Sequence, residues 1–378
     1  NGSSTAGDRL AQGWRTEGSI IFIPLDERYA TRGLWLNLVR LAKNKYDVQT
    51  PPLELISHRK RPANFEKLKS WVTDALSRSS ASERPAFIFS FEQLIYGGLI
   101  ASRTGNETLS AITDRLKWLV DLKLKYKNVK FYCSTTVMRI PAYNGDFEEP
   151  WYWQSYGRDL YEYSFYSSRY SSLKNNSDLV LANHYQSLIP GNVLKQFLWR
   201  RHRNFNVTYS LFQYQKAYNS LFDSLYLTLD DTGTYGFNVD EASKLKDLKA
   251  KLKLDPDAVR IYPGADEVES CLLSKMIAQN LLEEKPSVQI KWRLPNAINL
   301  IPNYEDQPIG LTVKDQVEAC GGNVIIDGDS GLQPDVIFAV NNFAKTPQLE
   351  ASQQSERPIS DYSKAFDNLT KLCHNGGT

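Results

Sequence analysis

The sequence predicts an α/β protein built from parallel strands, and three observations indicate this class. Short apolar or β-branched runs recur along the chain, and each is followed by a turn and a helical pattern, as in parallel βα units. The runs are apolar almost throughout, which is typical of strands buried on both faces. Carboxylates, arginines and glycine turns follow them directly. We expect two doubly wound, Rossmann-like parallel sheets, with a TIM-type α/β barrel as the alternative.

The elements are expected to alternate in chain order. The apolar runs predict strands at residues 20–24, 87–90, 130–134, 225–229, 259–262, 287–292, 324–326 and 336–340. Apolar residues at helical spacing predict covering helices at residues 31–43, 64–76, 109–124, 239–252 and 267–282. A further helix is expected at about 363–373, where a glycine stop follows.

The expected domains follow from these elements. Residues 19–147 form a first α/β unit and residues 221–345 a second one. Residues 148–220 are dense in Tyr and Trp and carry no strand signal, which predicts a helical, aromatic-rich insertion or cap. Residues 346–378 form a tail with one helix.

Composition and charge exclude several classes of function. The 378 residues are 42% hydrophobic and 23% charged, as in a globular protein. Lysine and arginine exceed aspartate and glutamate by 45 − 43 = 2, which is too little for the basic field of a nucleic-acid or anionic-membrane binder. No window approaches the roughly 18 apolar residues of a membrane-spanning helix. We therefore expect no nucleic-acid and no membrane partner.

Export is expected from two features. The chain begins at Asn1 without methionine, which suggests a removed leader. Sequons for N-glycosylation occur at Asn1 and, as the expected glycan sites, at Asn106, Asn175, Asn206 and Asn368. A secreted, extracellular protein fits both.

Cysteine and histidine spacing disfavours a zinc site. The four cysteines, Cys133, Cys271, Cys320 and Cys373, form no C-x-x-C pair and leave one or two disulfides open, with the pairing undetermined. The four histidines lack the H-x-x-x-H spacing, so any metal would need carboxylate ligands. No G-x-G-x-x-G or Walker spacing occurs, and we expect no cofactor.

The carboxyl ends of the predicted strands carry the candidate site residues. Ligands bind at this edge in open sheets and in barrels alike, so these side chains are expected to share one cleft. The candidate catalytic carboxylates are Asp230, Asp231, Asp266 and Glu267. The candidate substrate-binding residues are Asp26, Glu27, Arg28, Glu92, Tyr96, Arg103, Arg139, Tyr143, Asn144 and Tyr235.

Five ordered motifs resemble a known family, the bacterial and fungal group called domain of unknown function 4127. The motifs are PLDERYATR, YGGLIASR, MRIPAYN, DDTGTYG and YPGADE, and the resemblance covers most of residues 19–345. It implies family membership and supplies no reaction. Tyr29 stands where the family usually has proline, and Glu92 where aspartate is common.

The C-terminus also departs from the family. Similar bacterial chains continue with a further strand, an NGAD-like turn and a WNT-type segment, whereas this sequence stops at Thr378. We expect part of the natural protein to be missing, either as a second chain cleaved from the same precursor or as an omitted segment.

Several candidate residues also have an ordinary structural explanation. Asp230 and Asp231 could cap the next helix, Asp266 could be an N-cap, and Glu267 could interact with the helix dipole. The arginines could bind an anionic substrate or pair with these carboxylates. Trp151, Tyr152, Trp153 and Tyr156 could stack on sugar rings or pack between helices, and packing is favoured for most of them.

The residue types favour a secreted carbohydrate-active hydrolase. Glycosidic cleavage needs one protonated carboxyl group and one ionised carboxylate, drawn here from Asp230, Asp231, Asp266 and Glu267. The expected partner is a carbohydrate or another small anionic or polar substrate. One alternative is a hydrolase or lyase whose divalent metal is bound by oxygen ligands from Asp26, Asp231, Asp327 or Asp329. The other is a noncatalytic protein that binds a small ligand.

Overall fold

The computed structural model describes residues 18–42, 45–325 and 333–342. The chain divides into two compact units, one spanning Thr16–Leu273 and one beginning at Ser274. Both are built on parallel sheets, so the predicted α/β class is confirmed, and no barrel closes within the described residues. Several predicted features lie outside the described residues: the tail at 346–378 with its helix at 363–373, Asp327 with Asp329, Cys373, Asn1 and Asn368.

The first unit contains a six-stranded parallel sheet. Its strand order is β2-β1-β3-β4-β5-β6. The strands are β1 (Gly18–Ile23), β2 (Tyr46–Gln49), β3 (Ala86–Ser90), β4 (Lys130–Val137), β5 (Ser224–Leu229) and β6 (Val259–Pro263). Five of the six were predicted at nearly these bounds. The sequence missed β2, because its YDVQ segment is short and polar and lies at the sheet edge.

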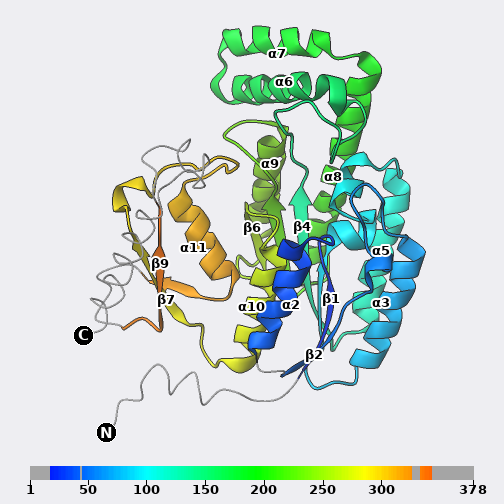
Figure 1. The fold of residues 1–378 in the computed structure, drawn as a ribbon, viewed down its shortest axis with the longest axis vertical. Helices are drawn as coiled ribbons and strands as arrows, with labels where there is room; N and C mark the ends of the chain where they lie inside the picture. Colours follow the sequence, from blue (N-terminus) through cyan, green and yellow to red (C-terminus); the bar gives the residue numbers. More distant parts are fainter. Residues whose placement is uncertain (1–17, 43–44, 326–332, 343–378) are drawn as a thin grey trace. The chain divides into compact units, whose positions relative to one another are not determined.

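Helices cover both faces of this sheet (Figure 1). On one face Phe89 and Leu227 belong to a core shared with α3 (Phe65–Ser79), α5 (Leu109–Lys125), α8 (Gly191–Ala217) and α9 (Phe237–Leu252). On the other face Trp35 of α2 (Leu34–Leu41) stacks on Phe22 at 3.8 Å between ring centroids. Its indole nitrogen donates to the Glu269 carbonyl of α10 (Val268–Leu281) at 3.1 Å. Strands that are apolar on both faces are stable only when helices cover both sides of the sheet, as they do in this doubly wound arrangement.

Two short π-helices and one short α-helix complete the turns after the strands. They are η1 (Tyr29–Gly33) after β1, η3 (Glu92–Tyr96) after β3, and α4 (Leu99–Thr104). Gly97 and Gly98 between η3 and α4 have φ of 86° and 136°. An added Cβ at Gly97 would lie 2.9 Å from the Ala63 carbonyl oxygen, so the YGGL turn needs glycine for both conformation and space.

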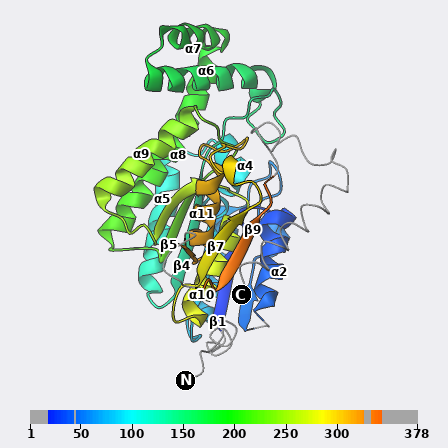
Figure 2. The same ribbon diagram turned by 90° about the vertical axis from the view of Figure 1, so that its left-hand side faces the viewer.

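The aromatic-rich segment is helical, as predicted, and forms part of the connection from β4 to β5. Helix α6 (Trp153–Leu173) and α7 (Asn176–Leu188) lie side by side, and the 27-residue α8 returns to the sheet (Figures 1 and 2). Tyr152 and Trp153 are buried in a small core with Leu160 and Phe197. Packing therefore accounts for these two rings, whereas Trp151 remains exposed.

The second unit is a smaller parallel sheet with strand order β8-β7-β9. Its strands are β7 (Ser287–Trp292), β8 (Asn323–Ile325) and β9 (Val336–Val340), and α11 (Ile309–Ala319) leads into β8. The sequence placed residues 225–229 and 259–262 in a second unit starting at 221. In the structure these strands pair with β4 and extend the first sheet, for example Leu225 beside Cys133. Apolar patterning predicts strands but not their neighbours.

The described residues contain three cysteines, Cys133, Cys271 and Cys320, and Cys133 is a buried free thiol. Among the helices in this part of the chain, none combines the length and apolar character needed to cross a bilayer.

Candidate functional site

The strand order places the first candidate residues at the point where the chain changes direction across the sheet. Strand β1 lies between β2 and β3, and ligands of open α/β sheets bind outside the carboxyl ends of strands at such a switch point. Asp26 and Arg28 follow β1, and Glu92 follows β3. These polar residues therefore follow the two strands, β1 and β3, between which the strand order favours a ligand site.

Arg28 bridges two strand ends. Its Nε donates to Asp26 Oδ2 at 2.8 Å, while Nη1 and Nη2 donate to both carboxylate oxygens of Asp266 at 3.0 and 2.7 Å. Asp26 is further held by the hydroxyl of Thr31 at 2.6 Å. A bidentate arginine–carboxylate contact has a defined geometry, so Arg28 orients Asp266 above the sheet edge. The side chain of Asp266 is thus the ion-pair partner of Arg28.

A second group of charged side chains, which we call the arginine–carboxylate cluster, joins three chain segments. It consists of Arg103, Arg139, Glu148, Glu149, Asp230 and Asp231. Arg103 donates to Asp230 and, at 3.3 Å, to Glu149. Arg139 donates to Glu149 at 2.9 Å, to Glu148 at 2.7 Å and to Asp231 at 2.5 Å. Glu149 therefore connects the two guanidinium groups.

The cluster holds more negative than positive charge. Two arginines face four carboxylates, which gives 2 − 4 = −2 when every group is ionised. Burial raises the pKa of Asp230, and the nearby Arg103 and Arg139 only partly offset this effect. Burial likewise raises the pKa of Glu149. A buried group with surplus negative charge tends to retain a proton, which makes a carboxyl of this cluster a candidate acid.

Asp230 and Asp231 have different environments although they are neighbours at the end of β5. The Asp230 side chain is 13% exposed and that of Asp231 is 44% exposed. Asp231 also has a φ of 35°, a left-handed conformation that is uncommon for residues other than glycine. Such conformations cluster at functional sites. The strand end thus presents one enclosed and one solvent-facing carboxyl group.

Glu92 lies beneath the site and is closed off from solvent. Its Oε1 accepts hydrogen bonds from Thr135 Oγ1 at 2.9 Å and from the Thr136 amide at 3.0 Å, and its Oε2 is buried with no hydrogen-bond partner among the described residues. Burial raises its pKa to about 7. A substrate-binding role was expected for Glu92, but the structure places it below the surface that a ligand could reach.

Glu269 is a second buried carboxyl group, which the sequence did not single out. It accepts a hydrogen bond from Ser134 Oγ at 2.5 Å, and burial raises its pKa well above the usual range. Ser134 and Thr135 are consecutive residues of β4 and point to opposite faces of the sheet. Glu269 and Glu92 therefore lie on opposite sides of β4 and do not form a shared site.

The remaining predicted residues lie in several settings. Tyr143 Oη accepts a hydrogen bond from Arg139 at 3.2 Å, which places it beside the cluster. Glu27 accepts from the Arg59 amide at 3.0 Å, and Asn144 from the Arg158 amide at 2.9 Å. Tyr96 and Tyr235 pack against other side chains, and Glu267 is half-buried beside the first turn of α10. These five residues serve local structure in the contacts described.

Sequence reasoning missed Glu148 and Glu149. They belong to the EEPWYW segment, which was interpreted as the start of the helical cap. The available signal was their doubled charge a few residues after the MRIPAYN motif, in the same loop as Arg139 and Tyr143. This loop also exposes Tyr143, Phe147 and Trp151, three aromatic side chains near the cluster in sequence.

The alternative of a divalent metal bound by carboxylates finds little support among the described residues. Within residues 18–42, 45–325 and 333–342, no group of three or more His, Cys, Asp or Glu side chains has an arrangement that could hold a metal ion. Two of the four proposed ligands, Asp327 and Asp329, lie outside this part of the chain. Asp26 and Asp231 pair with different arginines.

Fold and site together define an α/β protein with a Rossmann-like parallel sheet and a polar, arginine-rich site at the carboxyl edge of its strands. The chain belongs to the family described as "Protein of unknown function (DUF4127)", whose model matches residues 20–376. The resemblance inferred from the five motifs is thereby confirmed. No curated protein and no solved structure matches the chain.

Proposed function

We propose that the protein is a hydrolase of glycosidic bonds. The observation that carries this proposal is the pair of unlike carboxyl groups at the end of β5, Asp230 enclosed and Asp231 exposed, within a cluster of surplus negative charge. Glycoside hydrolysis requires one carboxyl group that is protonated near neutral pH and one that is ionised. Unlike surroundings are the usual means of separating two such pKa values.

The roles follow from the surroundings of each group. Asp230, whose pKa burial raises, donates a proton to the leaving glycosidic oxygen. Asp231 is held by Arg139 and faces solvent, which suits an ionised nucleophile or base. Arg103 and Arg139 position both groups, and the Arg28–Asp266 pair offers polar atoms for sugar hydroxyls.

Aromatic side chains support a sugar as the substrate. Tyr143, Phe147 and Trp151 are exposed on the loop that carries Glu148 and Glu149. Exposed rings combine an apolar face with a polar surrounding, and sugar rings have matching apolar faces. Buried rings of the same segment, such as Tyr152, are excluded from this role.

Leaving-group dependence tests the two catalytic roles separately. Asp230→Asn should lower kcat at least about a hundredfold on alkyl glycosides, which need a proton, and much less on 2,4-dinitrophenyl glycosides, which do not. Asp231→Asn should lower kcat about as strongly on both substrate types. Asp114→Asn is the matched control, because Asp114 is an exposed carboxylate of α5 that pairs with Lys117. Steady-state kinetics on a panel of both glycoside types provides the measurement.

Two results would contradict the proposal. Unchanged turnover in both aspartate variants would remove these residues from the chemistry. Saturable sugar binding by calorimetry, without product from any glycoside, would assign the protein to the noncatalytic binding class.

We further propose that the protein is secreted and carries N-glycans at Asn106 and Asn175. Both residues are exposed, and their known hydrogen bonds use Oδ1, as acceptor from Arg200 at 2.7 Å and from the Ser177 amide at 3.0 Å. A glycan attaches to the amide nitrogen instead. Asn206 is half-buried within α8, where a glycan would displace neighbouring side chains.

Expression through a eukaryotic secretory pathway tests this proposal. Glycopeptide mass spectrometry of the secreted protein should find glycans at Asn106 and Asn175 and none at Asn206. Asn106→Gln and Asn175→Gln should each remove one step of the endoglycosidase-dependent mobility shift. A secreted protein without glycans at the two exposed sequons would refute the assignment.

A further inference from the structure

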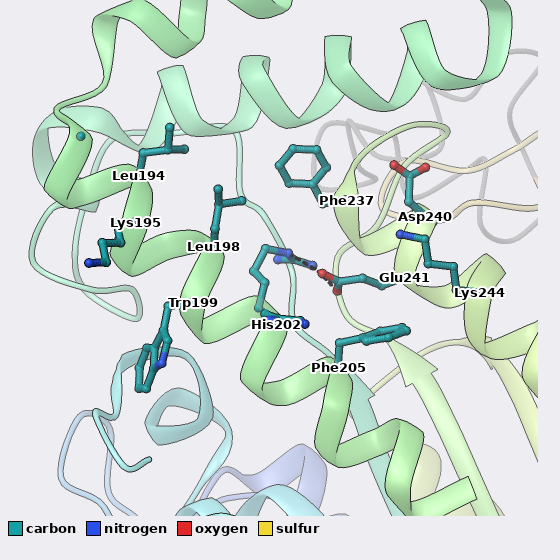
Figure 3. A pocket seen from close by; sticks show the side chains of 12 residues that line it. Leu194, Lys195, Leu198, Trp199, His202, Phe205, Phe237, Asp240, Glu241 and Lys244 are labelled. Atoms are coloured by element: carbon teal, nitrogen blue, oxygen red, sulfur yellow. Dashed lines mark hydrogen bonds and ion pairs between the residues drawn. The ribbon is translucent and has the colours of Figure 1, made fainter. Parts of the chain in front are cut away.

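A groove between α8 and α9 lies apart from the residues assigned to catalysis. Figure 3 shows Leu194, Leu198 and His202 of α8 on one side and Phe237 and Glu241 of α9 on the other. Its volume is about 880 Å³. Small-molecule sites typically occupy about 300–1,000 Å³, so the groove has the size of a ligand pocket.

The wall of the groove that α8 forms carries several apolar side chains, whereas the exposed side of a helix is usually polar. Leu194, Leu198 and Phe205 follow one another along one side of α8 at helical spacing, and Phe237 completes the apolar surface. Leu198 and its neighbour Trp199 are each 38% exposed. An apolar stripe of this kind is normally covered, so its exposure marks a binding surface.

The floor of the groove is rigid and its acids are already engaged. The Arg201 guanidinium is buried and donates to Glu241 Oε1 and Oε2 at 2.9 and 2.6 Å, and to the Met138 carbonyl at 3.0 Å. Asp240 accepts a hydrogen bond from the Ser168 hydroxyl at 2.7 Å. Because these partners hold the polar floor in place, the pocket is preformed rather than induced.

The lysines and the histidine of the groove are less firmly engaged than Arg201. Within the described residues, no ion pair or hydrogen bond joins the ammonium groups of Lys195 and Lys244 or the ring of exposed His202 to a partner, and Lys244 interacts with Glu241 electrostatically. The two lysines and Arg201 face Asp240 and Glu241, which gives 3 − 2 = +1 with His202 neutral. The available charge is therefore positive and lies at the rim of an apolar cavity.

We infer that this groove binds a small organic anion with an apolar, ring-containing body. The rings lie against Leu198 and Phe237, and the carboxylate, sulfonate or phosphate group interacts with Lys195 and Lys244. Charge complementarity selects the anion, and the open apolar groove selects the body. This ligand is additional to the glycosidic substrate proposed above and does not depend on it.

Fluorescence titration with 1-anilinonaphthalene-8-sulfonate, an aromatic anion, tests the inference on the full chain. One saturable site is expected. Leu198→Glu should weaken binding about tenfold or more, because it removes apolar contact and adds negative charge. Lys244→Glu should weaken binding about fivefold or more by charge reversal alone. N-phenyl-1-naphthylamine, the probe without the sulfonate, should bind more weakly than the sulfonate.

Matched controls separate the groove from general surface effects. Leu179→Glu alters a leucine of α7 that is 37% exposed, and Lys251→Glu reverses a charge on α9 outside the groove. Both should bind the sulfonate probe as the unmodified protein does. Equal affinity in the groove variants, or equal affinity for both probes, would overturn the inference. A dimer in sedimentation velocity that Leu198→Glu converts to a monomer would assign the groove to a second copy and would also overturn it.

Discussion

Replacing Arg103 with methionine should reduce the free energy of unfolding by about 3–5 kcal/mol at pH 7. The Arg103 side chain is 2% exposed and pairs with Asp230 and Glu149, both of which lie in the interior of the site. The variant leaves two enclosed carboxyl groups with one arginine fewer, and breaking a buried ion pair from one side is costly. Urea unfolding measures the loss.

The pH dependence of this loss identifies its cause. Without Arg103, the folded-state pKa values of Asp230 and Glu149 rise further above their unfolded values, so both groups bind protons more readily in the folded state. The defect should therefore shrink as the pH falls from 8 to 5. Arg158→Met is the control, since Arg158 is 61% exposed, pairs with Glu162 and should cost no more than about 1 kcal/mol. Similar losses in the two variants, independent of pH, would show that the cluster is not electrostatically coupled.

Glu92→Gln should stabilise the protein at pH 8 and leave its stability nearly unchanged at pH 5. Burial raises the pKa of Glu92 to about 7, against an ordinary value of 4.5. Between these values the folded state binds the proton that the unfolded state has released, so stability falls as the pH rises through this window. The raised pKa of Glu92 contributes about 3 kcal/mol to the free energy of unfolding, and this contribution is present in full below pH 4.5 and is lost above pH 7.

Glutamine is the informative substitution because it resembles the protonated acid in shape. It can still accept the hydrogen bonds from Thr135 and the Thr136 amide, and it has no charge to bury. Urea unfolding at four pH values between 5 and 8 gives the difference between variant and unmodified protein, which should grow with pH. Glu66→Gln, at a 75% exposed carboxylate, should show no such trend. A constant difference for Glu92→Gln would mean that Glu92 does not titrate in this range.

The sequence predicted the elements of the fold better than their grouping. Apolar runs are local features, and they located β1, β3 and β4 within a few residues. The assignment of residues 225–229 and 259–262 to a second unit differed from the structure, because strand partners depend on the packing of the whole sheet. The edge strand β2 is short and polar and had no usable pattern.

The sequence predicted which residues belong to the candidate site better than it predicted the contacts between them. Asp230, Asp231, Arg103 and Arg139 were singled out from their positions after strands, and the structure joins them in one cluster. Glu149, which connects the two arginines, comes from a loop that no periodic pattern describes. Glu92 was selected by the same rule of position, and its burial depends on η3 turning it under the sheet edge.

The amino-acid sequence alone determined the α/β class, the family and the concentration of acids and arginines at the carboxyl ends of strands. These properties follow from side-chain polarity and from spacing along the chain. The tertiary structure decided which groups meet, as in the contact of Arg103 with Asp230, 127 positions away. It also decided that Asp230 is enclosed whereas Asp231 faces solvent. Both outcomes depend on strand order and loop packing, which involve distant residues and leave no local signal in the sequence.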